Sequence, residues 1–269
     1  MGFENDNIIG IVGGMGPQAG IALFNSIMAC TRATADQQHL STILMSFPGQ
    51  IADRTDFLEG ELCINPAFNI AEVIMKLEHA GANIIGIACN TSHSPPIYDV
   101  ILDELNKRNS QVKVLHMPIE TCRLISEKYP QFRRIGIMVT NGTYKSELYA
   151  KLLHQFRYEP IVPDFEFQNT VIHSMIYDRE FGLKANAGVV TPKVRTLMGK
   201  ALRYFGERRA DAIILGCTDL SVMLSEKQLK GIQIIDSTES LARALVNKAG
   251  NCERIEYNGE SILTATSKE

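Results

Sequence analysis

The segments "ANIIGIACNTSH" (82–93) and "ADAIILGCTDL" (210–220) each place a cysteine directly after a continuous apolar run and directly before small polar residues. A short apolar run of this kind predicts a strand that is buried on both faces, which is typical of a parallel sheet. Cys89 and Cys217 are therefore expected at the carboxyl ends of two buried strands.

The rest of the chain alternates between strand and helix patterns. Three further apolar runs predict strands, namely "NIIGIVGG" (7–14), "STILMSFP" (41–48) and "VKVLHMP" (112–118). Segments with apolar spacing near 3.6 lie between them and predict helices, namely "PQAGIALFNSIMACTRA" (17–33), "PAFNIAEVIMKLEHAG" (66–81) and "PPIYDVILDELNKR" (95–108). Strands that alternate with helices indicate βαβ units, and hence the α/β class with parallel sheets flanked by helices.

The second half of the chain repeats the first. "RRIGIMVTNGT" (133–143) resembles the first strand and its turn, "ADAIILGCTDL" resembles the segment around Cys89, and "GIQIIDSTESLARALV" (231–246) resembles "VKVLHMPIETCRLI" (112–125). The repeat predicts two similar α/β domains related by a pseudo-twofold axis, the first formed by residues 1–117 plus 238–269 and the second by 118–237. The chain is expected to cross between them near 117–120 and 236–239.

Composition excludes several classes of function. The formal net charge of -3 provides no basic field, so nucleic acid is not an expected partner. No apolar run approaches 18 residues and the N-terminus "MGFENDN" carries acids, so neither a membrane span nor export is expected. Six cysteines in 269 residues are too sparse for a disulfide scaffold. We expect free thiols in a cytoplasmic protein.

The two cysteines suggest a specific chemistry. Ligands of open parallel sheets bind in the crevice at the carboxyl ends of the strands, so one thiol from each domain would line opposite walls of an interdomain cleft. Free backbone N–H groups at the following helix starts are expected to lower each thiol pKa from about 8.5. One thiolate could then remove a proton from a carbon while the other thiol protonates its opposite face. Such a pair inverts a stereocentre without a cofactor.

Alternative uses of these residues have weaker support. A single cysteine after a buried strand is commonly a small core residue. Cys30, Cys63, Cys122 and Cys252 lack the paired placement of Cys89 and Cys217, and we interpret them as structural or incidental. Zinc binding by Cys89 and His93 lacks the remaining ligands, so no metal is expected.

The glycine-rich turn in "GIVGGMG" (10–16) does not have the GxGxxG spacing of a dinucleotide site, and it lacks the lysine of a P-loop. No acidic residue follows "STILMSF" to hold a ribose. No cofactor is expected.

Five motifs together resemble the aspartate racemase branch of the aspartate/glutamate racemase superfamily: "GIVGGMGPQAG" (10–20), "IADRTDFL" (51–58), "ACNTSH" (88–93), "MVTNGT" (138–143) and "LGCTDL" (215–220). The resemblance extends from about residue 8 to residue 250. It implies two α/β domains, independence from pyridoxal phosphate, an acid–base pair of cysteines in the interdomain cleft, and a homodimer.

The resemblance also implies roles for individual residues. Cys89 and Cys217 match the catalytic pair. Arg54 matches a guanidinium that fixes a substrate carboxylate, and Lys184 ends a segment, "MIYDREFGLK" (175–184), that carries a substrate-facing lysine in the family. The residues expected to bind substrate are Met15, Arg54, Asn90, Thr91, Thr140, Thr143, Lys184 and Thr218.

Two positions depart from the family pattern. Asp219 stands where glutamate is common, and Ala52 replaces the proline of "IPDRT". Asp219 also differs from the histidine typical of the glutamate racemase branch.

The expected function is interconversion of L- and D-aspartate by a two-base mechanism on a small dicarboxylic amino acid. The alternatives are a racemase with glutamate or broader specificity, and a non-catalytic amino-acid binding protein.

Overall fold

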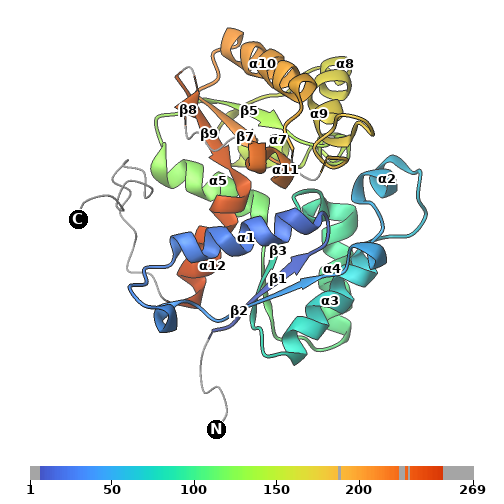
Figure 1. Cartoon of the computed structure of the whole chain (residues 1–269), viewed down its shortest axis with the longest axis vertical. Helices are drawn as coiled ribbons and strands as arrows, with labels where there is room; N and C mark the ends of the chain where they lie inside the picture. Colours follow the sequence, from blue (N-terminus) through green and yellow to red (C-terminus); the bar gives the residue numbers. More distant parts are fainter. Residues whose placement is uncertain (1–6, 187–188, 224–227, 230, 251–269) are drawn as a thin grey trace.

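The computed structural model describes residues 7–186, 189–223, 228–229 and 231–250, and it contains two separate sheets (Figure 1). The first sheet has four parallel strands in the order β2-β1-β3-β4. These strands are β1 (Ile9–Gly13), β2 (Thr42–Ser46), β3 (Ile84–Ile87) and β4 (Lys113–Leu115). The central strands β1 and β3 are buried along their whole length, as the apolar runs predict.

The second sheet repeats this topology. Its order is β6-β5-β7-β9-β8, and all pairs are parallel except β8 with β9. Its strands are β5 (Arg134–Met138), β6 (Glu159–Ile161), β7 (Ala212–Leu215), β8 (Gln228–Leu229) and β9 (Ile232–Asp236). β6, β5, β7 and β9 occupy the places of β2, β1, β3 and β4, so the repeat in the sequence corresponds to a repeat in strand order.

Helices cover both faces of the first sheet. Ile9 and Ile11 of β1 pack with α1 and α12 on one face, whereas Val12 packs with α3 and α4 on the other. This alternation follows from the two-residue period of a strand. The helical segments of this half are α1 (Pro17–Cys30), η1 (Asp36–Gln38), η2 (Pro48–Gln50), α2 (Arg54–Glu59), α3 (Ala67–His79), η3 (Thr91–His93), α4 (Pro95–Lys107) and α12 (Ser237–Ala249).

The second sheet is covered in the same way. Helices α5 and α7 pack on one face, and α9 and α10 pack on the other. The helical segments of this half are α5 (Met117–Lys128), α6 (Asn141–Lys145), α7 (Leu148–Gln155), α8 (Phe165–Phe167), the π-helix η4 (Gln168–His173), α9 (Ser174–Tyr177), α10 (Pro192–Glu207) and α11 (Thr218–Met223). No helix in the described part of the chain is both long and apolar enough to cross a membrane.

The chain passes between the two halves along α5 and returns along α12 (Figure 1). The crossing points expected near 117–120 and 236–239 are the first turns of these helices rather than loops. His116 caps α5 by accepting from the Ile119 amide at 3.3 Å, and Asp236 caps α12 by accepting from the Thr238 amide at 2.7 Å. Helix α12 comes after the second sheet in the chain but packs against α1 of the first half. We therefore retain, as a proposal, the predicted division in which this C-terminal segment belongs to the first domain.

Gly136 provides a test of how tightly the second sheet packs. A Cβ atom on Gly136 of β5 would lie 2.6 Å from Cδ1 of the buried Phe205 ring. We predict that Gly136→Ala lowers the free energy of unfolding by about 1–3 kcal/mol through overpacking. Gly199 lies within α10 with no atom near its added Cβ, so Gly199→Ala should stabilise by about 0.5–1 kcal/mol. Chemical denaturation measures both, and an unchanged stability for Gly136→Ala would contradict the packing described.

Candidate active site

One small pocket lies where the carboxyl ends of β3 and β7 approach each other. Its volume is only about 10 Å³, which is near the space that one water molecule needs. Twelve residues line it: Met15, Arg54, Cys89, Asn90, Thr91, Thr140, Tyr177, Lys184, Gly216, Cys217, Thr218 and Asp219. The pocket therefore brings together every residue predicted from the sequence for catalysis or substrate binding except Thr143.

The two cysteines occupy equivalent places in the two halves. Cys89 follows β3 by two residues and Cys217 follows β7 by two residues. Each is only 6% exposed. A helical turn begins shortly after each cysteine, η3 at Thr91 and α11 at Thr218, as expected from the sequence. The fold therefore presents two thiols, one from each sheet, to a single pocket.

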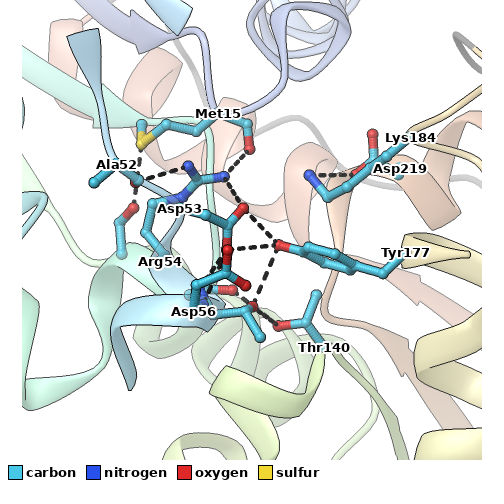
Figure 2. A network of polar contacts seen from close by, with 12 residues as sticks. Met15, Ala52, Asp53, Arg54, Asp56, Thr140, Tyr177, Lys184 and Asp219 are labelled. Atoms are coloured by element: carbon cyan, nitrogen blue, oxygen red, sulfur yellow. Dashed lines mark hydrogen bonds and ion pairs between the residues drawn. The ribbon is translucent and has the colours of Figure 1, made fainter. Parts of the chain in front are cut away.

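Arg54 is held in place by backbone carbonyls (Figure 2). Its Nη2 donates to the Met15 carbonyl at 2.9 Å, and its Nη1 donates to the Ala52 carbonyl at 3.1 Å. Burial lowers the pKa of Arg54, but the neighbouring Cys89, Tyr177 and Asp53 outweigh burial and raise it. The guanidinium is therefore a fixed positive charge beside the first cysteine.

Tyr177 joins the two halves at the pocket (Figure 2). Its hydroxyl, at the end of α9, contacts the two carboxylate oxygens of Asp53 at 3.1 and 3.3 Å and Thr55 Oγ1 at 3.3 Å. Burial raises the pKa of Asp53, but Arg54 and the amides of Asp56 and Thr55 lower it overall, so the carboxylate is ionised. Burial also raises the pKa of Tyr177, so its hydroxyl is the proton donor in this contact.

Lys184 and Asp219 form an ion pair in the second half of the pocket (Figure 2). The Lys184 Nζ atom lies 3.3 Å from Asp219 Oδ2 and 5.0 Å from the centre of the Tyr177 ring. Burial lowers the pKa of Lys184, but Tyr177, Asp219 and Cys217 raise it overall. The ammonium is therefore charged and is already partnered in this structure.

Asp219 also contacts the second cysteine. The Cys217 thiol donates to Asp219 Oδ2 at 3.6 Å. Burial raises the pKa of Cys217, and the Asp219 carboxylate raises it further, while Lys184 acts in the opposite direction. The expectation that its surroundings lower this pKa is wrong for Cys217, because burial and the adjacent carboxylate outweigh the cation and the backbone amide. Cys217 is a neutral thiol in this arrangement.

The predicted threonines form a hydroxyl cluster between the two halves. Thr91 Oγ1 lies 3.1 Å from Thr140 Oγ1 and 2.9 Å from Thr143 Oγ1, and Thr55 reaches Thr140 at 3.4 Å. Thr143 does not line the pocket, because its hydroxyl is directed to the other threonines. Its predicted contact with substrate is therefore not supported by this geometry.

His93 supports the first cysteine loop from behind. Its Nδ1 lies 2.9 Å from the Cys89 carbonyl, and its ring packs against Tyr98 and His116. Burial, with a smaller effect of His116, lowers the pKa of His93 to about 3, so the imidazole is neutral and donates this bond. Within the described residues, no group of three or more His, Cys, Asp or Glu side chains is arranged to hold a metal ion.

Sequence reasoning missed three residues of the pocket. Tyr177 lies in the segment "MIYDREFGLK" from which Lys184 was identified, and Asp219 was noted only as a departure from the family pattern. Gly216 precedes Cys217 directly. The pairing of Tyr177 with Asp53 joins positions 124 residues apart, and no local pattern in the sequence indicates it.

Comparison with known proteins identifies one family. A family model described as Asp/Glu/hydantoin racemase matches residues 12–245. The chain is 28% identical to the broad specificity amino-acid racemase RacX of Bacillus subtilis (strain 168), over 89% of this chain and 97% of that protein. It is 27% identical to a glutamate racemase of Pseudomonas aeruginosa (strain UCBPP-PA14), over 61% of this chain and 57% of that protein.

Among solved structures, the aspartate racemase of Picrophilus torridus is similar to this chain with a TM-score of 0.73 and 29% identity. The match covers 91% of this chain and 94% of that one.

The contacts of Cys217 generate a prediction about thiol reactivity. Because the Asp219 carboxylate raises the pKa of Cys217, Asp219→Asn should move the onset of Cys217 alkylation to lower pH. Lys184 lowers the same pKa, so Lys184→Met should move the onset to higher pH. Iodoacetamide alkylation as a function of pH, followed for the Cys217 peptide by mass spectrometry, measures both shifts. Equal midpoints in the wild type and both variants would show that these charges do not act on the thiol.

Proposed function

Because the chain belongs to the Asp/Glu/hydantoin racemase family, we propose that it interconverts L- and D-aspartate, with Cys89 and Cys217 as the two catalytic groups and no cofactor. The observation that carries the proposal is the single buried pocket shared by two thiols from equivalent strand ends and by two cations, Arg54 and Lys184. We also propose that the protein is a homodimer, as the family resemblance implies, and that it acts in the cytoplasm, as its composition suggests.

The proposed reaction moves two protons. A thiolate takes the α-proton, so that the Cα–H bond breaks and an S–H bond forms. The thiol on the other side then gives its proton to the opposite face of the α-carbon, which leaves a thiolate there. Cys217 is the neutral thiol in the structure described, so we assign it as the first proton donor and Cys89, beside Arg54, as the first base. The reverse direction exchanges these roles.

The cations of the pocket suggest how a dicarboxylate is anchored. The Arg54 guanidinium is fixed by two carbonyls and retains a buried Nε–H without a hydrogen-bond partner in the described structure. A planar fork of this kind suits a carboxylate. We propose that Arg54 holds one substrate carboxylate and that Lys184 holds the other. Lys184 must then share or release Asp219, with which it pairs in this structure.

The same ion pair favours a second candidate function. If Lys184 stays with Asp219, Arg54, whose Nη2 also lies 3.9 Å from Asp53 Oδ2, is left to bind a single carboxylate, and the pocket would accept amino acids with neutral side chains. One relative, which matches this chain over nearly the full length of both proteins, is named a broad specificity amino-acid racemase. Glutamate is a third substrate to be compared, because a partial relative is named a glutamate racemase.

A substrate panel decides among these candidates. We predict that the purified protein, without added cofactor, racemises L- and D-aspartate faster than glutamate or neutral amino acids, as followed by chiral chromatography. Arg54→Ala should lower kcat/KM for aspartate about 10- to 100-fold, since a charged hydrogen bond contributes roughly 1.5–3 kcal/mol.

Arg203 lies exposed on α10 and serves as the matched control, because Arg203→Ala removes an arginine that does not line the pocket. Racemisation of neutral amino acids at rates equal to or above that of aspartate would favour broad specificity. Binding of aspartate without any exchange of its α-hydrogen would instead indicate a binding protein.

A further inference from the structure

A buried chain of hydrogen bonds connects the two cysteine loops behind the pocket. The Tyr149 hydroxyl donates to Asn90 Oδ1 at 2.6 Å, Asn90 Nδ2 donates to Ser237 Oγ at 2.9 Å, and Ser237 Oγ donates to the Leu215 carbonyl at 2.8 Å. We call these groups the Tyr149 network. Each of the four residues is at most 2% exposed.

Each of the two hydroxyl groups in the network donates one hydrogen bond. A tyrosine or serine hydroxyl has a single proton to donate, and the asparagine amide supplies both an acceptor and a donor. The proton of Ser237 goes to Leu215, so its oxygen is free to accept from Asn90. Removing either hydroxyl leaves a buried polar partner unsatisfied, which is more costly than the net gain of the bond itself.

The ends of the network lie next to the two thiols. Asn90 follows Cys89 directly, and Leu215 precedes Cys217 by two residues. Tyr149 also touches the second loop with its ring, because a Cβ atom on Gly216 would lie 2.9 Å from Cε2 of Tyr149. The Tyr149 hydroxyl therefore bonds to the Cys89 loop, while the Tyr149 ring packs against the Cys217 loop.

The network also lies where the chain crosses between the halves. Ser237 is the first residue of α12, and Tyr149 packs on Cys122 and Ile125 of α5. Neither Tyr149 nor Ser237 lines the pocket. A ligand in the pocket would therefore not touch these two residues directly. They nevertheless connect the segments that carry the two thiols.

We propose that Tyr149 and Ser237 are positioning residues that fix the separation between Cys89 and Cys217, so that both sulfurs reach opposite faces of one α-carbon. The inference rests on the proposed function. It also reassigns the Asn90 side chain, which was predicted to bind substrate, to the support of the Cys89 loop, since its amide oxygen and nitrogen both bond within the network.

The two steps of the reaction depend differently on this separation. Abstraction needs one sulfur near the α-carbon, whereas inversion needs the second sulfur in place at the same moment. When the second sulfur is displaced, the carbanion is reprotonated by the thiol that took the proton, after that thiol has exchanged with solvent. In deuterium oxide the recovered substrate then carries more deuterium relative to the inverted product.

The test measures this ratio in deuterium oxide for the wild type, Tyr149→Phe and Ser237→Ala, with L- and D-aspartate. We expect the ratio of deuterium in recovered substrate to deuterium in product to rise at least about threefold in both variants. We also expect kcat to fall about tenfold with KM changed by less than about twofold. The ratio does not depend on the amount of folded enzyme, so partial loss of stability leaves it interpretable.

Tyr144→Phe is the matched control. It removes a tyrosine hydroxyl of the same half that donates to the Pro163 carbonyl at 2.9 Å rather than to a residue of either cysteine loop, and it should keep the wild-type ratio. Wild-type ratios in both Tyr149→Phe and Ser237→Ala would overturn the positioning role while leaving the racemase intact. A wild type that neither racemises nor exchanges would instead overturn the proposed function, and the positioning role with it.

Discussion

The structure depends on one constraint, which is that the central strands of both sheets are buried on both faces. A strand of this kind can carry only apolar side chains along its length, so its reactive residue comes after its carboxyl end. β3 and β7 obey the constraint in the same place of two sheets with the same strand order. Cys89 and Cys217 follow these ends at equal distances, and the pocket forms where the ends approach each other.

Much of this arrangement could be predicted from the sequence, because strands buried on both faces appear in it as continuous apolar runs. The runs around 84–87 and 212–215 gave the strands, and their repetition gave two similar halves. The position of Cys217 at a strand end was predictable for the same reason, but the rise in its pKa was not. That rise comes from burial and from the contact with Asp219, which only the folded chain shows.

The contacts across the pocket could not be predicted from the sequence either. Tyr177 bonds to Asp53, Asn90 bonds to Ser237 and Lys184 pairs with Asp219, and each pair joins segments between 35 and 147 positions apart. The resemblance to a family located Arg54 and Lys184, and it also assigned Thr143 and Asn90 to substrate binding. In the structure Thr143 lies outside the pocket lining and bonds to Thr91, whereas Asn90 lines the pocket and its amide also bonds to Tyr149.

The central claim is that two thiols act on opposite faces of one carbon, and single-thiol variants test it most directly. Cys89→Ala and Cys217→Ala are incubated separately with L- and with D-aspartate in deuterium oxide, and α-hydrogen exchange and inversion are both measured. The exposed Cys63→Ala serves as the control. We expect that neither single-thiol variant racemises, and that each exchanges only one enantiomer, a different one in each variant. Racemisation near the wild-type rate in either variant would contradict the two-thiol mechanism.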